Sequence, residues 1–145
     1  MAVTVNWYDH VSEILGDGTL DMDTHTFKII LLNSTHTFNA AHTQLSEITA
    51  NQLATGNGYT QDNKALASVT WTQTSGTSTF DAADVQWTAS GGAIGPARHA
   101  VIYDDTATND EIVCNINFGA DKTADDGTTF NINFNASGIF TIALP

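Results

Sequence analysis

The residues of this chain that are best suited to chemistry are five histidines, one cysteine and sixteen carboxylates. Zinc favours imidazole and thiolate ligands at short, regular spacings. The histidines are His10, His25, His36, His42 and His99. None belongs to an H-E-x-x-H pair, and the single cysteine rules out a C-x-x-C motif. We therefore expect no metal site, and we interpret the histidines as scattered polar surface residues, some of them with half-buried rings.

Two acidic segments could bind calcium, which prefers oxygen ligands. GDGTLDMD supplies Asp17, Asp21 and Asp23, and YDDTATNDE supplies four more acidic residues. The four are Asp104, Asp105, Asp110 and Glu111. Neither segment has the spacing of an EF-hand loop, with its glutamate at the last position. We interpret both segments as solvated turns rather than as cation sites.

The sequence contains no motif for nucleophilic catalysis or for nucleotide binding. A G-x-S-x-G turn, a P-loop and a dinucleotide fingerprint are all missing. A pair of carboxylates for glycoside hydrolysis could be drawn from any of the sixteen acidic residues, so their presence discriminates nothing. Cys114 alternates with Ile112 and Ile116, which is typical of a buried strand face. We therefore expect neither an enzyme nor a bound cofactor.

The charge balance disfavours two classes of partner. Four basic residues against sixteen acidic ones give a formal charge of −12. Such a chain is repelled by phosphate, so we expect neither nucleic acid nor an anionic membrane as a partner. The first residues have no basic region followed by an apolar stretch, and no apolar window reaches roughly the 18 residues of a membrane span. We expect a soluble protein made without a secretory signal.

In the N-terminal third, the spacing of apolar residues predicts short helices and one strand. The segment NWYDHVSEILGDG has helical spacing, which predicts an amphipathic helix that includes Trp7 and Tyr8 and ends at Gly16. The apolar run FKIILLNS predicts a strand buried on both faces. Good helix formers over residues 39–54 predict a second short helix followed by a loop.

From Ala67 onward the pattern changes to alternation with period two. ASVTWTQT and STFDAADVQWTAS predict a hairpin whose turn is SGT. Four more strand-length runs follow: HAVIYDD, EIVCNINFG, TTFNINFN and GIFTIAL. We therefore predict a mainly β fold in which residues 1–145 form a single domain. The expected architecture is an antiparallel β-sandwich or jelly-roll-like domain with one or two short helices in the N-terminal third.

Exposed aromatic side chains would suit a carbohydrate-binding module. Trp71 and Trp87 occupy positions where core packing is expected, so an exposed platform would have to come from other aromatics. These are Trp7, Tyr8 and Tyr59, the last in the turn-rich loop TGNGYTQDNK. A glycan-binding module on the host surface is therefore one alternative function.

The only arginine, Arg98, lies in the segment GPARHAVIYDD. We expect Gly95 and Pro96 to punctuate the start of a strand and the two aspartates to end it in solvent. Arg98 is predicted either to form a structural ion pair or hydrogen bond near the start of the strand, or to contact a neighbouring subunit or the capsid. The second alternative rests on the preference of protein interfaces for arginine.

Several segments resemble a family of small virion structural proteins of tailed bacteriophages and prophages. They are GTLDMDTHTFKIILLNS, SEITANQLATGNGYTQDNKALASVTW, STFDAADVQWTAS, ARHAVIYDDTA and INFGADKTADDGTTFNINFNASGIFTI. The family pattern has a TGxGY loop, a FDADDVxWT hairpin and ARYAVIYxDT, IDFG and GI(F/L)TL strands. The resemblance covers nearly the whole chain. His99 stands where the family usually has tyrosine, and INFG stands where it often has IDFG.

The resemblance implies a non-enzymatic component of the virion, made in the host cytoplasm. The charge of −12 disfavours contact with packaged DNA, so we expect the outer capsid surface. There, a decoration (cement) protein would bind the major capsid protein and stabilise the lattice by mass action, as a homo-oligomeric trimer or dimer. A tail- or fibre-associated structural role is an alternative. The candidate contact residues are Trp7, Tyr8, Tyr59 and Arg98.

Overall fold

A computed structural model describes residues 2–145 and confirms a mainly β, antiparallel, sandwich-like fold. Its strands are β1 (Thr4–Trp7), β2 (Phe27–Leu32), β3 (Thr70–Thr74), β4 (Thr77–Asp81), β5 (Val85–Thr88), β6 (Ile94–Asp104), β7 (Glu111–Ala124), β8 (Thr129–Ile132) and β9 (Phe140–Ala143). Its helical segments are α1 (Val11–Asp17) and the two 3-10 turns η1 (Leu45–Glu47) and η2 (Thr49–Asn51).

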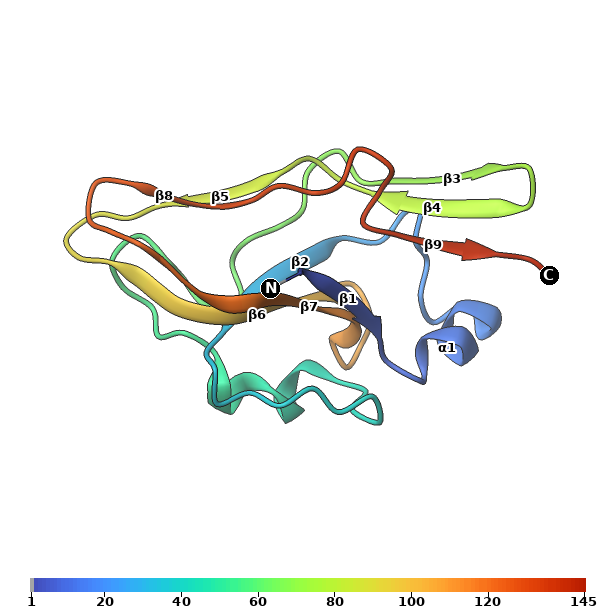
Figure 1. Ribbon diagram of the computed structural model, residues 1–145. Coiled ribbons are helices and arrows are strands. Elements are labelled where there is room, and N and C mark those ends of the chain that lie inside the picture. Colours follow the sequence, from blue (N-terminus) through green and yellow to red (C-terminus); the bar gives the residue numbers. More distant parts are fainter. Residues whose placement is uncertain (1) are drawn as a thin grey trace.

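The strands form two layers (Figure 1). The lower sheet has the order β1-β7-β6-β2, with every neighbouring pair antiparallel. The upper layer contains the three-stranded sheet β3-β4-β9 and the two-stranded sheet β5-β8, which lie end to end. β4 leads into β5, and β8 leads into β9, so the upper layer is one long ribbon interrupted near its middle.

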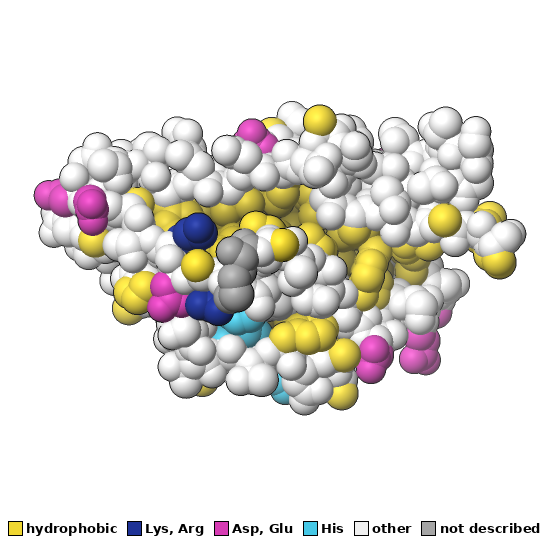
Figure 2. Space-filling view, in the orientation of Figure 1, with side chains coloured by type: hydrophobic (Ala, Val, Ile, Leu, Met, Phe, Trp, Pro, Cys, Tyr) yellow, Lys and Arg dark blue, Asp and Glu magenta, His cyan; other side chains and the backbone are white. Residues whose placement is uncertain are grey.

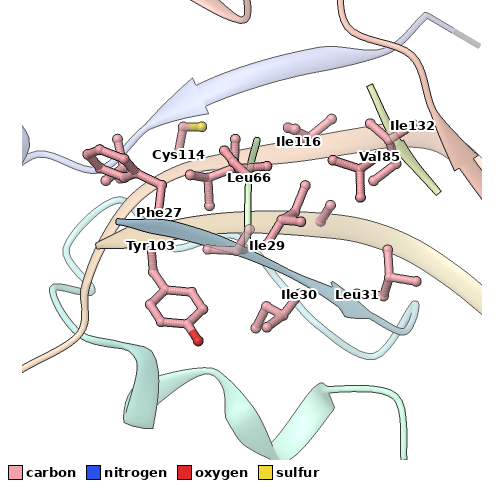
Figure 3. Close-up of a cluster of buried hydrophobic side chains, with 14 of the residues drawn as sticks. Phe27, Ile29, Ile30, Leu31, Leu66, Val85, Tyr103, Cys114, Ile116 and Ile132 are labelled. Carbon is pink, nitrogen blue, oxygen red and sulfur yellow. The ribbon is translucent and has the colours of Figure 1, made fainter. Parts of the chain in front are cut away.

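The main core lies between the layers, and a second apolar layer lies below the lower sheet. Phe27, Ile29 and Cys114 point from the lower sheet toward the upper layer, whereas Ile30 and Tyr103 point to the opposite side, toward the 3-10 turns (Figure 3). All residues of β2 except Lys28 are buried. The prediction of a strand buried on both faces is therefore confirmed.

The two edges of the lower sheet differ. The outer edge of β2 is covered by two loop segments, because the Leu31 carbonyl accepts a hydrogen bond from Leu53 N–H (2.9 Å) and the Phe27 carbonyl accepts one from Leu66 N–H (2.8 Å). β1 pairs with β7 on one side only, and no backbone partner lies on its other side within residues 2–145. The lower sheet thus has one covered edge and one open edge.

The N-terminal helix is shorter than predicted. Trp7 belongs to β1, where it pairs with Cys114, and the helix begins only at Val11. The left-handed residue after the helix is Gly18 (φ 84°) rather than Gly16. Long-range strand pairing overrides the helical spacing at Trp7. Within residues 39–54 the predicted helix is replaced by the two 3-10 turns.

Two strand boundaries also differ from the prediction. β6 already begins at Ile94 and includes the cis Gly95–Pro96 bond, so these residues lie inside the strand instead of preceding it. The segment STFDAADVQWTAS is divided between β4 and β5. At this break, the Asp84 side chain accepts a hydrogen bond from Phe134 N–H (2.8 Å), which fixes the bend between the two strands.

Candidate interaction surface

Tyr8 and Tyr59 are buried, so their prediction as exposed contact residues is wrong. Tyr8 is 1% exposed and packs against Phe38, with ring centroids 5.2 Å apart. Tyr59 is 2% exposed, and its hydroxyl accepts hydrogen bonds from Leu31 N–H and Gln52 Nε2, both at 3.1 Å. Burial raises the pKa of both phenols above its usual range. Both rings therefore anchor loops to the lower sheet.

The other aromatic candidates provide no open platform. Trp87 is buried as predicted, and Lys64 Nζ lies 5.3 Å from its ring centroid. Trp71 and Trp7 are only partly buried, and the Trp7 ring lies 4.0 Å from that of Phe140. Within residues 2–145 the exposed large hydrophobic residues are Val3, Val5 and Leu144, none of which is aromatic. No aromatic side chain is thus among the exposed large hydrophobic residues of the described chain.

Arg98 forms an ion pair near the surface. Its Nη1 lies 3.3 Å from Asp121 Oδ1, and the two side chains are 29% and 46% exposed. Asp121 belongs to β7 and Arg98 to β6, so the ion pair links adjacent strands. This observation confirms the predicted structural ion pair, while a contact between Arg98 and another subunit or the capsid stays a prediction.

An Arg98→Ala variant is expected to lose less than about 1 kcal/mol of unfolding free energy, because solvent screens an exposed ion pair. Chemical denaturation of wild type, Arg98→Ala, Asp121→Ala and the double variant measures the coupling between the two charges. A loss above about 2 kcal/mol would show that the ion pair matters more to the fold than its exposure indicates.

A long apolar groove of about 900 Å³ separates the open edge of the lower sheet from the upper layer. Figure 2 shows it as a yellow band between the two layers. Its apolar lining residues are Val3, Val5, Ile116, Phe118, Phe130, Ile132, Phe134, Ile139 and Phe140. Lys122 is its one charged lining residue, and no carboxylate lines it within the described chain. The groove is therefore a surface without carboxylates on a strongly acidic protein.

Sequence reasoning missed this groove, because its residues come from opposite ends of the chain. Phe130, Ile132 and Phe134 alternate with asparagines, a pattern typical of a strand with one core-facing side. Phe130 and Ile132 are buried, and Phe134 is partly buried. The missed part is the segment from Val3 into β1, where Val3 and Val5 alternate with polar residues. This alternation with period two was the available signal for a strand.

Two histidines lie together below the lower sheet instead of at the surface. His36 and His99 are 5% and 6% exposed, and their ring centroids are 5.0 Å apart. His36 Nε2, His99 Nδ1 and both polar atoms of the buried Asn115 side chain make no hydrogen bond within residues 2–145. The interpretation of these two histidines as scattered surface residues is therefore wrong.

Burial lowers the pKa of both imidazoles, because a charged ring is poorly solvated there. The pKa of His36 falls to about 4, through burial first and the nearby His99 second. The pKa of His99 is lowered by burial and then by the neighbouring positive charge of Arg98. Both rings are thus neutral at pH 7.

The acidic segments contain two buried carboxylates, those of Asp104 and Glu111. Asp104 is completely buried, where it contacts His25 Nδ1 and accepts hydrogen bonds from Thr106 N–H (2.9 Å) and Ala107 N–H (3.2 Å). The prediction that Asp104 ends its strand in solvent is therefore wrong. Asp21, in contrast, caps a turn at the surface by accepting hydrogen bonds from the backbone of Asp23 and Thr24.

Cys114 is fully buried, as predicted, and burial raises the pKa of its thiol to about 12. Across residues 2–145, no three histidine, cysteine or acidic side chains converge so that they could hold a metal ion. No helix of this part of the chain has both the length and the apolar character to cross a membrane.

Comparison of the chain with known protein families, with curated proteins and with solved structures found no match.

Proposed function

We propose that this chain is a non-enzymatic structural protein of a tailed-bacteriophage particle that decorates the outer surface of the head. In this role it binds the major capsid protein as a homo-oligomer and stabilises the capsid lattice. The proposal starts from the resemblance of the sequence to small virion proteins. Its structural support is that most of the few positive charges are paired within the chain.

Three of the four cations have partners within the chain. Lys28 Nζ lies 2.8 Å from Asp105 Oδ1, Arg98 is paired with Asp121, and Lys64 lies over the Trp87 ring. Lys122, at the apolar groove, has no such partner within residues 2–145. The described surface therefore has no basic patch that could bind phosphate.

The lack of a basic patch favours the outer surface of the head over its DNA-filled interior. A formal charge of −12 would repel packaged DNA, whereas the outside of the shell carries no such penalty. A decoration protein that binds the mature lattice more tightly than the immature one shifts the equilibrium toward the mature form. The two-layer sandwich provides a well-packed unit for this role, without any requirement for catalysis.

The direct test is to add the purified chain to DNA-filled heads that lack it. Quantitative mass spectrometry gives the number of copies per head, and a cryo-electron microscopy map gives their position. We expect saturable binding of many copies, following the symmetry of the capsomers on the outer surface. Immature, unexpanded heads serve as the control and should bind less. A few copies per particle, or density at the tail, would overturn the head-decoration proposal in favour of a tail or fibre role.

The stabilising role has its own readout. Heads carrying the protein should retain their DNA to a higher temperature, or through a stronger osmotic shock, than heads without it. Equal DNA release from both kinds of head would contradict the stabilising role even if the chain binds. A glycan array tests the alternative of host recognition, and specific retention of one sugar class would favour it.

A further inference from the structure

β1 is only four residues long, but it has none of the other features that usually protect an exposed sheet edge. Natural edge strands carry charges, prolines or bulges, or are covered by a loop, and these features prevent pairing with another chain. β1 contains Thr4, Val5, Asn6 and Trp7, and its register with β7 is regular. The opposite edge of the same sheet, at β2, is covered by loop segments. The edge at β1 is thus the unprotected one.

The register of β1 shows which backbone groups face outward. Tyr8 N–H donates to the Val113 carbonyl (3.4 Å), and the pairs Asn6–Asn115 and Thr4–Asn117 follow at steps of two residues. In an antiparallel pair, alternate residues bond to the same neighbour. The N–H and C=O groups of the intervening residues, Val5 and Trp7, therefore point away from β7 and are available to another strand.

The side chains of β1 extend the apolar groove to this edge. Trp7 packs against Phe140 of the upper layer, and side chains two residues apart share a face of a strand. Val5 and Val3 accordingly line the groove. They are 38% and 59% exposed, so two of the three exposed large hydrophobic residues within residues 2–145 lie here. An open backbone edge and an uncovered apolar surface thus coincide.

The charge distribution indicates which partner covers the β1 edge and the apolar groove. Two molecules with a formal charge of −12 repel each other, and they can associate closely only through surfaces free of carboxylates. β1 carries no charge, and the groove carries only Lys122. The edge of an antiparallel strand is also self-complementary about a two-fold axis, which places the same residues on both sides of the contact.

We propose that two copies of this chain form a symmetric dimer in which their β1 strands pair antiparallel. The two lower sheets then continue into one sheet through the outward backbone groups of Val5 and Trp7. Val3 and Val5 of both copies meet on the same side of this joined sheet, and the two grooves face each other. Each copy thereby covers the apolar surface that the other leaves open.

The test measures the mass of the purified chain in solution by sedimentation velocity over a range of concentrations. Wild type is expected to reach the dimer mass. In Val5→Pro the proline removes the outward N–H, while the hydrogen bonds from Thr4 and Asn6 to β7 are kept. We expect the dissociation constant of the dimer to rise at least about tenfold. Circular dichroism and the Tm show whether this variant is folded.

Two further variants keep the experiment decisive. Val3→Lys places a charge in the exposed part of the groove, and it should weaken the dimer even if Val5→Pro fails to fold. Leu144→Lys is the matched control, because Leu144 is 77% exposed and lies outside the groove. It should dimerise like wild type. Hydrogen exchange should show the Val5 and Trp7 amides protected in the wild-type dimer and unprotected in Val3→Lys.

Several results would overturn the proposed dimer. They are a wild-type monomer at about 100 µM, a closed trimer, a dimer that persists in both Val5→Pro and Val3→Lys, and loss of the dimer in Leu144→Lys. Because the experiment uses the isolated chain, its failure leaves the proposed binding to heads intact, although a wild-type monomer would remove the homo-oligomer from that proposal. Conversely, a chain that dimerises through β1 but ignores capsids would overturn only the proposed virion function.

Discussion

Replacing Phe80 with alanine is expected to lower the free energy of unfolding by about 3–5 kcal/mol, the usual cost of removing a large buried aromatic ring. Phe80 is completely buried in β4, with the rings of Phe27 and Phe140 at 5.1 Å and 4.9 Å. Phe27 belongs to the lower sheet and Phe140 to the upper layer. The ring of Phe80 therefore joins the two layers, and its loss leaves a cavity at their junction.

Urea denaturation at one fixed, low protein concentration measures this loss, since any self-association would add to the apparent stability. Phe38→Ala is the matched control. Phe38 is only partly buried and packs against Tyr8, so its replacement should cost clearly less than that of Phe80. Equal costs for the two variants would show that the contact between the layers is not the main source of stability.

Acidification should destabilise the fold through its buried histidine pair. In the unfolded chain, histidine has its ordinary pKa of 6.5, whereas the pKa of folded His36 is about 4. Below pH 6.5 the unfolded state therefore binds more protons than the folded state, so the free energy of unfolding decreases as the pH is lowered. The loss is absent above about pH 7, develops between 6.5 and 4, and approaches about 3 kcal/mol for His36 at the acidic end. The lowered pKa of His99 adds to it in the same direction.

The measurement is the unfolding free energy of wild type and His36→Gln at several pH values between 4 and 8. Carboxylates contribute to acid unfolding in both proteins, so the difference between the two curves isolates His36. We expect the unfolding free energy of His36→Gln to rise relative to that of wild type as the pH falls. A constant difference across the whole range would mean that His36 is readily protonated in the folded protein.

Features specified by neighbouring residues could be predicted from the sequence. The turn between β3 and β4 was predicted from the sequence SGT. In the structure, Ser75 and Gly76 adopt φ angles of 50° and 82°. Two successive positive φ angles match the twist of a hairpin, and a small polar residue followed by glycine tolerates them. The strand Phe27–Leu32 was predictable for a similar reason, since its apolar run needs no partner to be recognised.

Features that depend on distant residues could not be predicted. The turn-rich letters around Tyr59 correctly predict a surface loop, but they give no sign that its ring turns inward to Leu31 and Gln52. His36 and His99 are brought together by the folding of β6 against the segment before η1. The apolar groove could not be predicted for the same reason, because Val5 and Phe140 line it from opposite ends of the chain.

The strand order of the lower sheet also sets an order of assembly. β1 ends at Trp7, yet its partner β7 begins only at Glu111. Closing so long a loop costs much more entropy than forming the β6–β7 hairpin, whose strands are neighbours in sequence. The hairpin therefore provides the template, and we expect β1 to be among the last strands to be incorporated. Until then the nascent chain carries an unpaired, uncharged β-strand, the kind of segment that chaperones protect during synthesis.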